Sequence, residues 1–164
     1  MRKLVAATSL VFTTMSQGPV LASDGARSLV GNFQVEVSRE PFVDGVQRAV
    51  AVVIEGETLF ALRCVEGRLD FLISSPALDL KANEEMDIMY RVDSGDVHTL
   101  SGAAVATHEA VTMFAHGIFD ELKDARTVAV RVVSERSTVI LSFPVVNGDR
   151  AATVVKTACE YHPK

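Results

Sequence analysis

The feature that most constrains this fold is an alternation of apolar and polar side chains with a period of two, repeated in short runs along the chain. In NFQVEVS (residues 32–38), Phe33, Val35 and Val37 fall on one face of an extended chain, and polar residues fall on the other. This alternation is typical of a strand with one face buried against a core. Its repetition predicts a domain built mainly from antiparallel β-sheet.

Six further runs have strand character: VQRAVAVVIE (46–55), TLFALRCV (58–65), RLDFLIS (68–74), EMDIMYRVD (85–93), RTVAVRVV (126–133) and STVILSF (137–143). Turn residues at Glu66-Gly67 and at Glu135-Arg136 predict two hairpins among them. The segment 97–115 is ambiguous, and we interpret it as two short strands because Gly102 and His108-Glu109 interrupt it.

Two segments change from the strand period to the helical one. In residues 115–125 the apolar positions are spaced i, i+3, i+4 and i+7, at Ala115, Ile118, Phe119 and Leu122. In residues 147–161 they fall at Ala151, Val154, Val155, Ala158 and Cys159. Both patterns predict amphipathic helices, a short one and a C-terminal one that Asn147 or Asp149 can cap.

The chain has two cysteines, Cys64 and Cys159. The strand phase turns Cys64 toward the core, and the helical phase places Cys159 on the apolar stripe. Two thiols in one exported domain usually pair, so we predict a disulfide. The alternatives are a metal site and a catalytic thiol; neither is favoured, because no C-x-x-C occurs and His162 follows Cys159 only at a common spacing. The predicted fold class is therefore α+β, a curled or sandwich-like antiparallel sheet with a short helix and a disulfide-tethered C-terminal helix.

The first residues resemble a secretory signal. Arg2 and Lys3 precede an apolar run that is too short to span a bilayer, and Val20-Leu21-Ala22 offers small residues for cleavage. We predict a signal peptide over residues 1–22 and a single β-rich domain over 23–164. The alternative is an amphipathic or buried N-terminal helix. Export predicts a periplasmic or fully secreted protein without an integral membrane segment after processing.

Charge limits the class of partner. The chain has a net charge of −5, and removing residues 1–22 leaves 14 basic against 21 acidic residues, a net charge of −7. An acidic protein is disfavoured as a ligand of nucleic acid or of an anionic membrane surface.

Catalytic and cofactor motifs are missing from the sequence. It contains no H-E-x-x-H, G-x-S-x-G, Walker loop or dinucleotide fingerprint. His98 and His108 could meet across a hairpin, but two ligands are too few to predict a metal site. The sequence therefore predicts no catalytic residues, no metal and no cofactor, and it favours a non-catalytic role.

Three arginines occupy the outward phase of predicted strands: Arg63, Arg91 and Arg131. Guanidinium groups bind carboxylates and phosphates bidentately, so these residues are candidate contacts for an envelope protein or an anionic envelope component. The alternative is that they are solvated residues that protect sheet edges.

The order of short motifs resembles a known family. Arg63-Cys64, RLDFLIS, Tyr90-Arg91, a short helix ending in Leu122, paired strands and Ala158-Cys159 follow one another as in the VasI/TagO family of exported proteins associated with type VI secretion. The resemblance covers most of residues 30–161 and is distant, since the tryptophans common in the family are absent here. It implies a periplasmic accessory or binding protein. Two alternatives stay open: a small cell-envelope hydrolase, and a secreted inhibitor that neutralises an effector.

Overall fold

The computed structural model describes residues 26–39 and 47–160. These residues form ten strands and two helices: β1 (Ala26–Val30), β2 (Phe33–Arg39), β3 (Gln47–Glu55), β4 (Thr58–Val65), β5 (Arg68–Ser74), β6 (Glu85–Val92), β7 (His98–Ala106), β8 (Glu109–Thr112), α1 (His116–Glu121), β9 (Thr127–Val133), β10 (Thr138–Pro144) and α2 (Gly148–Glu160). The predicted signal peptide and its cleavage site after Ala22 lie outside them. Within these ranges no helix is both long and apolar enough to cross a membrane.

All described strands belong to one sheet with the order β1-β2-β3-β4-β5-β8-β7-β6-β9-β10, and every neighbouring pair is antiparallel. Both predicted hairpins are present, β4–β5 and β9–β10. The ambiguous segment forms two strands, as we interpreted it. The prediction of a mainly antiparallel α+β fold is confirmed.

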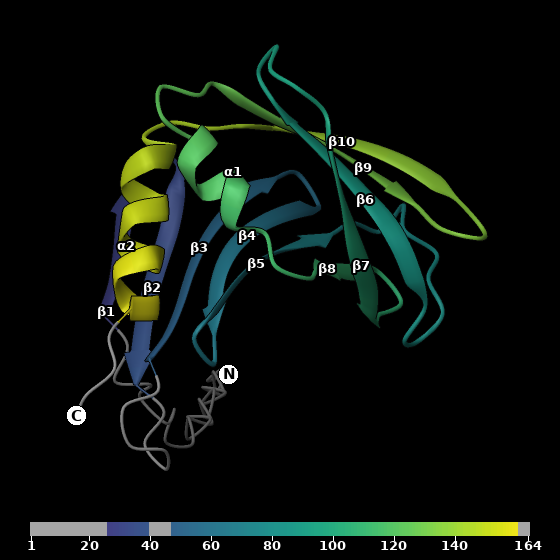
Figure 1. Ribbon diagram of the computed structural model, residues 1–164, viewed down its shortest axis with the longest axis horizontal. Helices are drawn as coiled ribbons and strands as arrows, with labels where there is room; N and C mark the ends of the chain where they lie inside the picture. The colour runs from purple at the N-terminus through teal and green to yellow at the C-terminus, as the bar shows by residue number, and fades with distance from the viewer. Residues whose placement is uncertain (1–25, 40–46, 161–164) are drawn as a thin grey trace, which may run out of the picture.

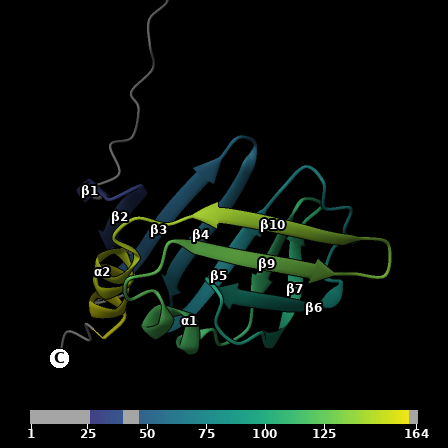
Figure 2. The same cartoon turned by 90° about the horizontal axis from the view of Figure 1, so that it is seen from above.

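The sheet curls until its two halves face each other across the core, with β6, β9 and β10 crossing over β3 to β5 (Figures 1 and 2). Phe71 of β5 meets Tyr90 of β6 edge to face, with ring centroids 5.8 Å apart. The apolar positions of the alternating runs supply this core. Phe60, Leu62 and Cys64 of β4 are fully buried, as their phase predicts.

The open sheet is bridged near its ends by Asn32, which lies in the turn between β1 and β2. Its side-chain nitrogen donates to the backbone oxygen of Pro144 (2.7 Å), and its side-chain oxygen accepts from the backbone nitrogen of Val146 (2.8 Å). Gly31 beside it has a positive φ of 62°, and a Cβ there would lie 1.8 Å from the Val146 oxygen. The bridge therefore requires glycine at position 31.

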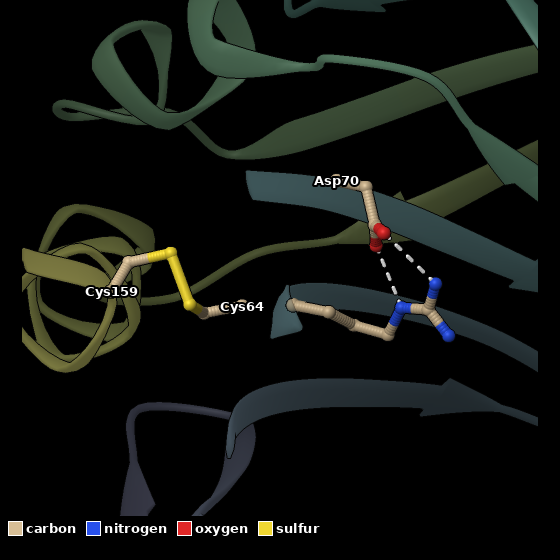
Figure 3. The surroundings of a disulfide bond; sticks show 4 residues. Cys64, Asp70 and Cys159 are labelled. Carbon is tan, nitrogen blue, oxygen red and sulfur yellow. Dashed lines mark hydrogen bonds and ion pairs between the residues drawn. A yellow bond between two sulfur atoms is a disulfide. The ribbon is translucent and has the colours of Figure 1, made fainter. Parts of the chain in front are cut away.

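The C-terminal helix α2 packs on the inner face of β2, β3 and β4, and α1 packs against it (Figure 1). The predicted disulfide is present: Cys64 and Cys159 are bonded with their Cα atoms 5.5 Å apart, which joins β4 to α2 (Figure 3). Helix α1 ends at Glu121, whereas the predicted helical segment extended to Ala125. The chain turns there, and Asp124 adopts a positive φ of 57° that no α-helix continues.

Candidate functional site

Arg91 and Arg131 lie on the outer face of neighbouring strands. In the register of β6 and β9, Arg91 is opposite Ala129, and Arg131 is opposite Met89. Along each strand the neighbours of the arginine are buried, as Tyr90 and Val92 are beside Arg91 and Val130 and Val132 are beside Arg131, so the arginines point away from the core. They are diagonal neighbours on one face, a separation that long side chains can span.

The two arginines line one hollow of about 180 Å³ over β6, β9 and β10. Its lining residues are Met89, Tyr90, Arg91, Val97, Ala129, Val130, Arg131 and Ile140. Two of them, Val97 and Ile140, are apolar and exposed, with 61% and 64% of their surface accessible to solvent. The hollow therefore offers two cations beside apolar surface.

Neither arginine of this hollow forms an ion pair within residues 26–39 and 47–160, although seven other pairs form there. Asp87 lies on the same outer face and is diagonal to Arg131, since it faces Val133 in the register. It does not pair with Arg131. Two guanidinium groups without carboxylate partners can accept an external anion through bidentate hydrogen bonds.

Arg63, the third predicted contact, lies elsewhere. It is directly opposite Asp70 in the register of β4 and β5, and it donates to both carboxylate oxygens at 2.7 and 3.0 Å (Figure 3). Three strands, β5, β8 and β7, separate β4 from β6. The structure thus brings together Arg91 and Arg131 but not Arg63. The guanidinium group of Arg63 is already hydrogen-bonded to Asp70 on the neighbouring strand.

A second polar cluster, which the sequence did not predict, joins α1 to the sheet. Glu121 Oε1 accepts a hydrogen bond from the Tyr90 hydroxyl (3.3 Å) and lies 3.1 Å from His98 Nε2. The rings of Tyr90 and His98 stack with centroids 4.8 Å apart. Burial, and next the charge of Glu121, raise the pKa of Tyr90 above its ordinary value.

This cluster also explains Gly117 of α1, because a Cβ there would lie 3.0 Å from the Tyr90 hydroxyl. Helix α1 ends at Glu121, and the side chain of this residue reaches the Tyr90 hydroxyl. A tyrosine in the inward phase of a strand was the available signal, because a buried hydroxyl group needs a partner.

His98 and His108 do not meet across a hairpin. His98 begins β7, and His108 lies in the turn after its other end, where its Nδ1 contacts the backbone oxygen of Leu78. Nowhere in the described part of the chain do three or more His, Cys, Asp or Glu side chains gather in a way that could hold a metal ion.

Comparisons with protein-family models, with curated proteins and with solved structures find no match for this chain. The resemblance to the VasI/TagO family stays a prediction from the sequence.

Proposed function

We propose that this protein is a non-catalytic binding protein of the cell envelope, which holds an anionic group of its partner between Arg91 and Arg131. The observation that carries the proposal is the pairing of two outward arginines in one hollow, without carboxylate partners in the described residues. The domain has an excess of acidic residues, but these two neighbouring cations repel each other. An anion bound between them lowers the electrostatic energy.

The surroundings favour a protein segment over a simple anion. Val97 and Ile140 present exposed apolar surface beside the guanidinium groups. A carboxylate-bearing side chain within a partly apolar peptide can use both the charge and this surface. Inorganic phosphate or a purely polar polymer can use only the charge.

The cellular context is proposed from the sequence. A signal-like first segment and a disulfide support export to the periplasm or beyond. The resemblance to the VasI/TagO family supports an accessory role in type VI secretion.

The proposal is tested by binding measurements with three probes: a glutamate-containing peptide, its glutamine counterpart and inorganic phosphate. We expect the glutamate peptide to shift the NMR signals of the Arg91 and Arg131 Nε–H groups, and the glutamine peptide to leave them unchanged. Arg91→Lys and Arg131→Lys should each weaken binding about fivefold to tenfold, because lysine keeps the charge but loses the bidentate fork. Arg68→Lys, at the exposed start of β5, is the matched control. Equal binding of the glutamate and glutamine peptides would refute the proposal.

One observation favours a second candidate, a small envelope hydrolase. A carboxylate beside His98 Nε2 can orient the ring and leave the other nitrogen available as a base. The hollow of Arg91 and Arg131 does not include His98 among its lining residues. Hydrolysis of peptidoglycan or peptide substrates that is lost in His98→Ala and kept in Arg131→Lys would support this candidate over the binding protein.

A further inference from the structure

Strand β10 is an open edge of the sheet. Among the strands of residues 26–39 and 47–160 it pairs with β9 alone, at the end of the strand order. Hydrogen bonds from Ser134 N to Ser137 O and from Val145 N to Arg126 O mark bonded pairs at the two ends of the β9–β10 hairpin. In an antiparallel ladder, hydrogen-bonded pairs alternate with non-hydrogen-bonded pairs. Thr138, Ile140 and Ser142 fall in the non-hydrogen-bonded pairs, so their backbone N–H and C=O groups point away from β9. All three residues are exposed.

The devices that usually protect an edge strand are nearly absent from β10. Its sequence, TVILSFP, contains no charged residue, and its one proline, Pro144, is the last residue. Edge strands commonly carry lysine, inward charges or bulges that prevent pairing with another chain. The opposite edge differs, because β1 carries Arg27, paired with Glu36 of β2 at 2.8 Å.

The β9–β10 hairpin is also held at both ends. At its turn, Glu135 N donates to Glu84 Oε1 (3.0 Å), and its carboxylate pairs with Lys81 (3.1 Å). Arg136 pairs with Asp79, also at 3.1 Å. At the other end, Asn32 bonds the backbone of Pro144, the last residue of β10, and that of Val146. A strand fixed in this way loses little conformational entropy when another strand joins it.

We propose that an extended acidic segment of a partner protein adds to the edge of β10 as a further antiparallel or parallel strand, and that one of its carboxylates is bound by Arg131. The proposal rests on the proposed function and specifies its ligand. Strand addition supplies affinity through backbone hydrogen bonds, and side-chain contacts supply specificity.

The register makes the carboxylate contact feasible. Ile140 is directly opposite Arg131, and both side chains lie on the outer face. An added strand would lie about 4.8 Å beyond β10, so its residue beside Ile140 is about 10 Å from the Arg131 backbone. A glutamate and an arginine side chain together cover that distance. Exposed Ile140 lies between them and can pack under both stems.

The test begins with a displayed library of linear peptides of random sequence, selected in parallel on the parent protein and on Arg91→Glu/Arg131→Glu. We expect the parent to enrich peptides that place Asp or Glu among β-branched residues. Synthetic copies should bind the charge-reversed variant at least about tenfold more weakly. No enrichment, or equal affinity for the variant, would overturn both the proposed function and this inference.

Two N-methylated copies of the best peptide then test strand addition itself. Methyl groups on alternate residues remove the N–H groups of one edge of the peptide, and the second copy carries them in the other phase. We expect one copy to lose binding about tenfold or more and the other to keep it, because only one edge faces β10. If both copies bind and the arginine dependence persists, strand addition is wrong and the proposed function stands.

A variant of the protein gives the complementary test. Ile140→Pro removes an N–H that faces the open edge, a position where an edge strand tolerates proline. Ile140→Pro should fold, as judged by its thermal unfolding, but should no longer bind the peptide. Ile140→Thr keeps the backbone N–H and should keep most of the affinity for the peptide. A parent protein that sediments as a dimer, and becomes a monomer in Ile140→Pro, would overturn the assignment in favour of a second copy at this edge.

Discussion

The ring of Phe60 on β4 stacks on the ring of Phe143 on β10, with centroids 5.6 Å apart and an interplanar angle of 30°. Five strands separate β4 from β10 in the order of the sheet. The contact therefore exists only because the sheet curls, and it reports directly on the packing of the two halves.

Phe143→Ala should lower the free energy of unfolding by about 3–5 kcal/mol, because it removes a fully buried ring and leaves a cavity. Urea denaturation followed by circular dichroism measures the change. Ile140→Ala is the control on the same strand, and its outward side chain should contribute less than about 0.5 kcal/mol. Similar effects of the two substitutions would contradict a buried interface between the halves.

Replacing both Cys64 and Cys159 by Ala should lower the free energy of unfolding by about 2–5 kcal/mol, because the bond closes a long loop in the unfolded chain. The loss should equal that of the parent protein after reduction. Thiol titration of unfolded, unreduced parent protein should detect no free thiol. Two titratable thiols there would disprove the bond.

Arg63→Lys should lower the free energy of unfolding by only about 1 kcal/mol, because the pair with Asp70 is partly screened by solvent. The variant keeps the charge but loses one of two parallel hydrogen bonds. Its affinity for a carboxylate peptide should equal that of the parent protein, unlike that of Arg131→Lys. Weakened peptide binding in Arg63→Lys would place Arg63 in the binding site after all.

The raised pKa of Tyr90 predicts a loss of stability at alkaline pH. Below about pH 10, the ordinary pKa of tyrosine, the hydroxyl is protonated in both the folded and the unfolded chain, and the contribution of the site is complete. As the pH rises above that value, the unfolded chain releases a proton that the folded protein keeps, so the free energy of unfolding falls.

The measurement uses Tyr161→Phe, which leaves Tyr90 as the single tyrosine. Ultraviolet absorbance of the folded protein should then show tyrosinate only well above pH 10, and Glu121→Gln should move the transition to lower pH. An unshifted transition near pH 10 would rule out the buried contact with Glu121.

Gly31→Ala and Gly56→Ala form a matched pair, because both glycines have φ near 60°. A Cβ at Gly56 meets nothing within 4 Å, so that substitution should cost about 1 kcal/mol of backbone strain. At Gly31 the Cβ would collide with the backbone of Val146, and the loss of stability should be several times larger. Equal melting temperatures for the two variants would contradict the bridge near the ends of the sheet.

Most strands could be predicted because alternation records which face is buried. Strand β1 was not, since its large apolar residue Leu29 points outward and is 72% exposed. Both helices could be predicted from their apolar stripes. The C-terminal end of α1 could not, because it depends on the turn around Asp124.

The site could be predicted only in part. The hairpin loop Glu66-Gly67 sets the register that places Asp70 opposite Arg63, so this pair was accessible from the sequence. The meeting of Arg91 and Arg131 was not, because β6 pairs with β9 after two intervening strands and a helix. Pairing between distant segments is decided by the assembled core and leaves little trace in local patterns.

The bond between Cys64 and Cys159 has a consequence for resistance to proteolysis. The 95-residue separation encloses every element from β5 to α2 in one covalent ring, including both candidate polar clusters and the open edge of β10. A single peptide-bond cleavage within that ring opens it without releasing a fragment. The nicked protein stays one molecule until the disulfide is reduced, and the paired strands on either side of the cut keep the sheet assembled.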